Sequence, residues 1–263
     1  MSIATYDDLA AATRLQAAWA AQVPAAGSAI EVWTLAGTPP TSAATPGTAY
    51  TNHSSALMTF PDLSPIEKFL VEFESSCPSS SGQLVWLMDR LVGVGQSIVG
   101  TGDKTINSTA LPRYTTGEDV MVFLEVTTIT ATTLPVISLA SYTNQAGASG
   151  RAGASLSWPS AVQEVNSWIG PMPLQSGDSG VRSVETINVS AAPSAGVVNV
   201  VLAKPLIFSG HAAGPSVGLP IGVTAMDYVF PRRIYDGATL VCIYKGNSAN
   251  VMQEGGITVA LDG

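Results

Sequence analysis

The stretch that decides the fold class is Val181-Arg182-Ser183-Val184-Glu185-Thr186-Ile187-Asn188-Val189, in which apolar residues are separated by one or two polar ones. This pattern predicts a half-buried β-strand, because successive side chains of a strand point to opposite faces. A second apolar segment, residues 197–203, follows the turn-forming residues Pro193-Ser194-Ala195-Gly196. Two strands joined by a turn are therefore expected here.

Short apolar segments of the same kind recur along the chain and are separated by clusters of Gly, Pro, Ser and Thr. The further segments expected to be strands are residues 29–35, 84–91, 120–126, 136–142, 206–208, 228–230, 239–244 and 257–261. Many short strands with turn signals at roughly regular spacing predict a mainly β protein, with a β-sandwich or jelly-roll body.

The N-terminal segment has the best helix signal of the chain. Residues 6–22 are predicted to form a helix, with Asp7 near the positive end of its dipole and Pro24 beyond its last turn. The apolar stripe of this helix would be Leu9, Ala12, Leu15 and Trp19. Two interpretations remain open: the helix packs on its own domain, or it is an arm that docks on a neighbouring subunit.

The following segment mixes several signals. Residues 36–56 are rich in Gly, Thr, Pro, Ser and Ala and are expected to form a long surface loop or an extended arm. Residues 63–70 contain Pro65 at a possible first helical position, which suggests a short turn or helix. From about residue 105 onward the pattern is β throughout. We therefore divide the chain into an N-terminal segment of residues 1–104, with helix, arm and mixed β structure, and a β-sandwich or jelly-roll domain of residues 105–263.

The charge balance and the apolar pattern exclude several classes of partner. Eleven Lys and Arg stand against nineteen Asp and Glu, for a net charge of −8. So few basic residues cannot neutralise many phosphates, so a nucleic-acid partner is not expected. No apolar run approaches the roughly 18 residues of a transmembrane helix, and no signal peptide is visible, so no membrane partner is expected. The two cysteines, Cys77 and Cys242, are too few for a disulfide framework, which suits a chain made in the cytoplasm.

The low total charge also bears on the surface. Only 11% of the residues are charged, against roughly 25% in ordinary soluble domains. The chain has 28 Ser and 24 Thr, with 25 Gly and 17 Pro. A surface made of such residues is weakly solvated and suits close packing against other protein.

One short motif resembles a catalytic signature. Gly177-Asp178-Ser179-Gly180 matches the stretch that carries the nucleophilic serine of chymotrypsin-like proteases. His53 precedes it, and Asp89, Asp103 and Asp119 lie between, so the order of a triad is formally possible. However, the motif continues as Val181-Arg182 and His53 lies in an unrelated setting. We interpret the motif as a turn that opens the following strand.

The other candidate sites give weaker signals for binding or catalysis. The glycines of residues 93–100 do not have the spacing of a dinucleotide-binding loop, and we expect a flexible loop after a strand. His53 and His211 have no Cys, His or carboxylate neighbours at metal-binding spacing, so no metal or other cofactor is expected. The sparse carboxylates do not indicate a glycosidase pair.

The few charges cluster beside aromatic or acidic residues. These clusters are Asp89-Arg90, Arg113-Tyr114, Asp178 with Arg182, and Arg232-Arg233-Ile234-Tyr235-Asp236. In a chain so poor in charge, a guanidinium is expected to have a specific acceptor. Internal ion pairs and contacts between subunits are both open interpretations.

Several segments resemble parts of virion proteins from tailed bacteriophages. They are Leu87-Met88-Asp89-Arg90-Leu91, Leu111-Pro112-Arg113-Tyr114, Ser141-Tyr142-Thr143-Asn144-Gln145-Ala146-Gly147, Gly177-Asp178-Ser179-Gly180-Val181-Arg182-Ser183-Val184 and Tyr235-Asp236-Gly237-Ala238. The resemblance spans about residues 86–240. It implies a capsid-associated structural protein, of the decoration or cement type, located in the virion. It supplies no active-site residues.

The leading hypothesis is a non-enzymatic phage protein that stabilises the head shell by bridging subunits of the major capsid protein. It would form a homo-trimer or a dimer. Residues expected at its interfaces are Leu9, Leu15, Trp19, Trp33, Arg113, Tyr114, Arg182, Arg232 and Arg233. One alternative is a tail, receptor-binding or carbohydrate-binding virion protein, which exposed Trp158 and Trp168 would favour. The other is a serine hydrolase centred on Ser179.

Overall fold

The protein has a mainly β fold. The computed structural model describes residues 8, 11–22, 29–31, 37–38, 58–59, 63–76, 83–130, 133–159, 167–211, 220–224, 232–246 and 253–262. These residues form seventeen strands, which pair antiparallel in three sheets. Within these ranges no helix is long and apolar enough to cross a membrane.

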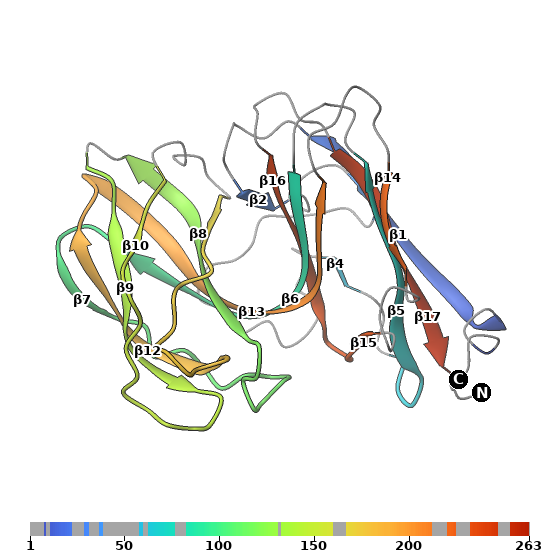
Figure 1. Ribbon diagram of the computed structural model, residues 1–263, viewed down its shortest axis with the longest axis horizontal. Coiled ribbons are helices and arrows are strands. Elements are labelled where there is room, and N and C mark those ends of the chain that lie inside the picture. Colours follow the sequence, from blue (N-terminus) through green and yellow to red (C-terminus); the bar gives the residue numbers. More distant parts are fainter. Residues whose placement is uncertain are drawn as a thin grey trace.

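A seven-stranded central sheet connects the two halves of the molecule. Its strands are β2 (Ala29–Glu31), β4 (Met58–Thr59), β6 (Gln83–Ser97), β8 (Met121–Thr130), β11 (Trp168–Ile169), β13 (Ala195–His211) and β16 (Thr239–Gly246). The strand order is β11-β8-β13-β6-β16-β2, and β4 also pairs with β16. The two longest strands, β6 and β13, run from one half of the molecule to the other (Figure 1).

Each of the other two sheets lies in one half of the molecule (Figure 1). The four-stranded sheet has the order β10 (Leu156–Ser157), β9 (Val136–Asn144), β12 (Val181–Ala191) and β7 (Gly102–Thr105). The six-stranded sheet has the order β14 (Pro220–Thr224), β5 (Glu67–Ser76), β17 (Gln253–Asp262), β1 (Thr13–Gln22) and β3 (Gly37–Thr38), with β15 (Arg232–Ile234) also paired to β5.

Two apolar cores lie between the sheets, and residues of the central sheet belong to both. The first core combines Phe73 and Val259 of the six-stranded sheet with Leu87 of the central sheet. The second core combines Ile187 of the four-stranded sheet with Val200 of the central sheet. All five side chains are fully buried, and each such burial stabilises the fold by roughly 1.5–3 kcal/mol.

A proline lies inside the longest strand. Pro205 belongs to β13, whose register against β6 shifts between Leu202 and Ala203 and again between Pro205 and Ile207. The pairing of β13 with β8 ends at Ala203, so Pro205 lies beyond that ladder. The missing amide hydrogen therefore leaves the β8 ladder intact, and the two bulges allow the strand to bend between the two cores.

The expected strands agree with this fold wherever the chain is described. Residues 84–91, 120–126, 136–142, 181–189, 239–244 and 257–261 all lie within strands, apart from residue 120. Residues 197–203 and 206–208 belong to one strand, β13. Only Ala29–Glu31 of the expected strand 29–35 is described, and residues 228–230 lie outside the described residues. The boundary at residue 104 stays a prediction.

The predicted N-terminal helix is wrong for most of its length. Thr13–Gln22 forms strand β1, which pairs with β17 from Thr13↔Leu261 to Gln22↔Gln253. Alanine and leucine give this segment a high helix propensity, but propensity is a weak preference that a long ladder of backbone hydrogen bonds overrides. Of the expected arm at residues 36–56, only Gly37–Thr38 is described, as strand β3.

Two further expectations need correction. Residues 63–66 do form a turn, but Glu67–Ser76 continues as strand β5 instead of a helix. The glycines expected in a flexible loop, Gly93 and Gly95, lie within strand β6 and pair with Val201 and Asn199 of β13. Neighbouring strands supply the ladder here, so the glycines do not interrupt the strand.

Candidate functional site

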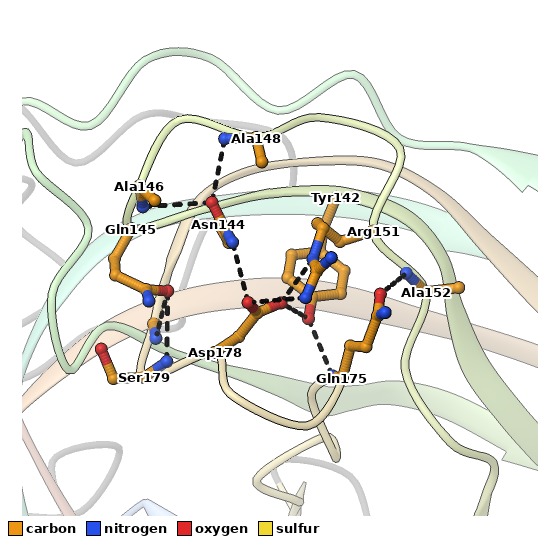
Figure 2. Close-up of polar contacts among 11 residues, drawn as sticks. Tyr142, Asn144, Gln145, Ala146, Ala148, Arg151, Ala152, Gln175, Asp178 and Ser179 are labelled. Carbon is orange, nitrogen blue, oxygen red and sulfur yellow. Dashed lines mark hydrogen bonds and ion pairs between the residues drawn. The ribbon is translucent and has the colours of Figure 1, made fainter.

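The Gly-Asp-Ser-Gly motif lies where two loops meet at one end of the four-stranded sheet (Figure 2). The carboxylate of Asp178 accepts four hydrogen bonds and its side chain is only 3% exposed. The Tyr142 hydroxyl donates to Oδ2 over 2.5 Å, and Asn144 Nδ2 donates to Oδ1 over 2.8 Å. Arg151 donates twice, from Nε to Oδ2 and from a terminal nitrogen to Oδ1, both over 3.0 Å. Asp178 therefore joins β9, the loop after it and its own turn.

This arrangement shifts two pKa values in opposite directions. The hydrogen bonds from Arg151 and then from Tyr142 stabilise the charged form of Asp178 and lower its pKa to about 2. Burial, followed by the hydrogen bond to Asp178, raises the pKa of the Tyr142 hydroxyl. At neutral pH the pair is a carboxylate and a neutral phenol, which is the state that holds the loops together.

The residues that follow Asp178 also hold the loops together through hydrogen bonds. The side-chain oxygen of Gln145 accepts hydrogen bonds from the backbone amides of Ser179 (3.1 Å) and Gly180 (3.3 Å), as Figure 2 shows for the Ser179 end of the loop. Arg182 donates to the backbone oxygens of Gln145 (2.7 Å) and Thr116 (3.1 Å). The expected pairing of Asp178 with Arg182 is thus replaced by Asp178 with Arg151.

The aspartates that could have completed a serine-hydrolase triad are each bonded elsewhere. Asp89 accepts two hydrogen bonds from Arg113, Asp103 accepts one from Asn188, and Asp119 pairs with Lys204. Among the described residues, no hydrogen bond joins the Ser179 hydroxyl to a histidine; His53 itself lies outside them. In the described part of the chain, the motif is a turn anchored by its aspartate.

The Asp89-Arg90 pair lies in the middle of strand β6 and sends its two charges to different partners. Asp89 is bonded to Arg113 over 2.9 and 2.6 Å, and it also accepts the backbone amide of Thr239 over 3.0 Å. Burial raises the pKa of Asp89, while the bonds from Arg113 act in the opposite direction. This pair connects the central sheet to the loop between β7 and β8.

Arg90 forms the second buried pair. Its two terminal nitrogens donate to the carboxylate of Glu125 on β8 over 3.1 and 2.7 Å. Asn199 on β13 donates to the same carboxylate over 2.7 Å, and the Trp168 ring lies 5.5 Å from the guanidinium carbon. The four side chains come from four neighbouring strands, so the network ties the central sheet together from within.

The C-terminal charge cluster surrounds strand β15. Lys68 is 1% exposed and contacts Asp236 over 2.5 Å, whereas Arg233 pairs at the surface with Glu67 over 2.7 Å. The ring of Tyr235 lies under Arg233, at 4.7 Å, and meets the ring of Tyr114 edge-on at 5.1 Å.

Tyr114 itself is mostly enclosed. Its ring lies 5.7 Å from the ammonium of Lys204, and burial raises the pKa of its hydroxyl well above the usual range. Tyr114 and Tyr235 thus join the loop after β7 to the turn between β15 and β16.

The expected interface residues fall into three groups. Arg113 is buried, Tyr114 and Arg182 are half-buried, and Arg232 and Arg233 are exposed. The remaining four expected interface residues are less fully described. Leu15 and Trp19 lie on β1, and Leu9 and Trp33 lie outside the described residues. Their role in subunit contacts stays a prediction.

The observation that would favour a carbohydrate-binding protein is absent. Trp158 and Trp168 are each 3% exposed, so neither presents a stacking surface. No group of three or more potential metal ligands occurs within the described ranges.

Sequence reasoning singled out Asp89, Arg90, Arg113 and Asp178 but not the side chains that bind Arg90 and Asp178. It missed Arg151, Glu125 and Lys68. One available signal was that Arg151 is the only charged residue in the Gly/Ala/Ser segment 146–155. In such a segment a single arginine is expected to bind a particular acceptor.

Comparison of the chain with protein-family models, with curated proteins and with solved structures finds no significant match.

Proposed function

We propose that this chain is a non-enzymatic structural protein of a tailed-bacteriophage head, which binds the shell and stabilises it by bridging subunits of the major capsid protein. The observation that carries the proposal is the use made of its polar residues. The carboxylates of Asp178, Glu125 and Asp89 are at most 3% exposed, and all three are bonded to arginines of the same chain. Carboxylates that are paired in this way make a scaffold rigid.

The same proposal assigns the body of the protein to the β-sandwich class. The central sheet shares one core with the six-stranded sheet and another with the four-stranded sheet. Two sandwiches that share a sheet make one continuous rigid unit. The phage-like segments support this assignment, because residues within them, such as Arg113, Asn144 and Asp178, form the internal contacts of that unit.

The mechanism would be mechanical. Strands β6 and β13 pair from Ser97↔Val197 to Gln83↔His211, across both halves of the molecule. A load that pulled the halves apart would have to shear this ladder and the buried Arg90–Glu125 pair together. A surface with few charges would meet the shell, since the cores of protein interfaces are depleted in charged residues.

Sedimentation with purified particles tests the proposal. Recombinant protein is mixed with phage heads that lack it, and bound protein is measured in the pellet over increasing concentration. We expect saturable binding with a fixed number of copies per head and increased resistance of the heads to heat. Protein that remains in the supernatant at every concentration would contradict the proposal.

A surface variant locates the contact. Arg233→Ala removes an exposed ion pair with Glu67, and such pairs contribute only about 0–1 kcal/mol to stability, so the fold is retained. If Arg233 lies at the shell contact, the variant binds more weakly than the matched control Glu118→Ala, which removes another exposed charge. Equal binding by both variants would remove Arg233 from the interface.

A further inference from the structure

Among the described residues, one edge of strand β1 in the six-stranded sheet is only partly paired. One side of β1 pairs with β17 along its length, from Thr13 to Gln22. On its other side, within the described ranges, only Ala18 and Trp19 are paired, with Thr38 and Gly37 of β3. The backbone of Thr13 through Ala17 therefore presents amide and carbonyl groups that no described strand pairs.

The opposite edge of the same sheet is covered. There, β5 pairs with β14 over residues 72–76 and with β15 over residues 68–70. In the other two sheets the terminal strands β2, β7, β10 and β11 are two to four residues long. Short edge strands are a common device against unwanted pairing. Strand β3 has two residues, and it leaves residues 13–17 of β1 without a described partner on that side.

The sequence limits how far a strand following β3 could pair along this edge. If β3 continued along β1 past Thr38↔Ala18, the next residues in register would be Pro39 and Pro40. Proline has no amide hydrogen and cannot donate to a ladder. The chain thus carries no donors at the two positions that would pair with Ala17 and Gln16.

The edge also lacks the usual protection against pairing. Strand β1 contains one charged residue, Arg14, and no Lys, Asp, Glu, Pro or Gly. Natural edge strands commonly carry charges or prolines that prevent association. In an antiparallel pair of two copies centred on Leu15, Arg14 of each copy would lie across from Gln16 of the other. No like charges would therefore lie directly opposite each other.

We propose that residues 13–17 of β1 form a dimerisation edge, on which the same segment of a second copy of this chain pairs antiparallel. The two six-stranded sheets would then continue as one sheet across a twofold axis. Each copy offers the same edge, so the contact is isologous and closes at two copies. A trimer built on strand pairing would need two different edges on each copy, whereas residues 13–17 of β1 offer one. The proposal concerns self-association and holds whether or not the protein binds a shell.

Light scattering after size exclusion tests the pairing directly. The full chain is measured from about 1 μM to about 1 mM, the range in which dissociation constants of weak to moderate complexes fall. We expect a mass that rises from 27.0 kDa to twice that value. Amides of residues 13–17 should exchange with deuterium more slowly at the high concentration than at the low one.

Two neighbouring proline variants supply a matched control. Consecutive residues of a strand direct their amides to opposite sides, so of Thr13→Pro and Arg14→Pro one removes an outward donor and the other a donor to β17. We expect the outward variant to weaken dimerisation at least tenfold with little change in melting temperature. The other variant should mainly lower the melting temperature.

The outcomes separate this inference from the proposed function. A monomer at every concentration, or an oligomer whose mass and exchange neither variant alters, overturns the dimerisation edge. Protection of residues 13–17 only after phage heads are added would also overturn it, and would assign the edge to a shell subunit. A dimer that does not sediment with heads supports the edge and contradicts the shell-binding proposal.

Discussion

Two arginines of this protein bind a carboxylate in the same way but in different surroundings. Arg90 holds Glu125 through two nitrogens in the middle of the central sheet, and both side chains are at most 2% exposed. Arg151 holds Asp178 through two nitrogens at a loop, where its own side chain is 27% exposed. The geometry alone does not say how much either pair contributes. The two sites differ in whether water can take the place of a lost partner. This difference determines how much the free energy of unfolding should fall when each pair is broken.

The largest effect is expected from Glu125→Ala. Arginine stays charged, and removing one partner of a buried ion pair costs about 3–5 kcal/mol because the remaining charge is left in the interior. Urea unfolding should show this loss, and Glu125→Gln, which keeps an acceptor oxygen for Arg90 and Asn199, should lose less. A loss below about 1 kcal/mol for Glu125→Ala would mean that water reaches the centre of the sheet.

The next effect tests how tightly the Asp178 turn is held. A Cβ on Gly180 would lie 2.0 Å from the backbone oxygen of Gly117, so Gly180→Ala must displace backbone and should cost at least the ~1–3 kcal/mol of overpacking. The control is Gly177→Ala, where no atom lies within 4 Å but φ is +88°. Its cost should be about 1–2 kcal/mol, from the left-handed conformation alone. Equal melting temperatures for the two variants would contradict close packing at Gly180.

Titration of Asp178 should have a smaller effect, confined to acid. Its pKa is lowered from 3.8 to about 2, chiefly by Arg151, so the charged form is favoured in the folded state. The resulting stability is present above about pH 4–5 and is lost as the pH falls through about 2. Thermal unfolding of the protein and of Asp178→Asn should therefore differ at pH 6 and converge near pH 2. A difference that does not change with pH would show that the charge of Asp178 is not what holds the loops.

The smallest effect is expected from Ser179→Ala. The Ser179 contact in the network comes from its backbone amide, which the substitution keeps. Stability should change by less than about 0.5 kcal/mol, as for substitutions away from special features. A fluorophosphonate probe should label neither protein. Labelling that disappears in Ser179→Ala would support the serine hydrolase and overturn the structural interpretation of the motif.

The sequence predicted strands well where neighbouring residues alone carry the signal. The pattern in residues 181–189 and the apolar run 239–244 both belong to strands, β12 and β16. Prediction failed where pairing with distant residues decides the secondary structure. Thr13–Gln22 has a helical composition but pairs with the last strand of the chain, from Thr13↔Leu261 to Gln22↔Gln253, and no local pattern encodes so distant a partner.

The candidate site follows the same division. The sequence singled out Asp178 and Arg182 together because they are close along the chain. In the fold Asp178 binds Arg151 from another loop, and Arg182 binds backbone oxygens. Adjacent side chains of a strand point to opposite faces, so Asp89 and Arg90 likewise have partners on different elements.

What the sequence by itself determined is the class of structure: a mainly β chain with few charges, in which short apolar segments recur between turns. That follows from local physics, since a strand with one buried face needs apolar residues at alternate positions. Only the tertiary structure decided which strands pair, which acceptor each buried arginine binds, and that, among the described residues, one side of β1 is paired only at Ala18 and Trp19. Those outcomes depend on contacts between residues far apart in the chain. Such contacts stabilise the protein only once the sheets have formed.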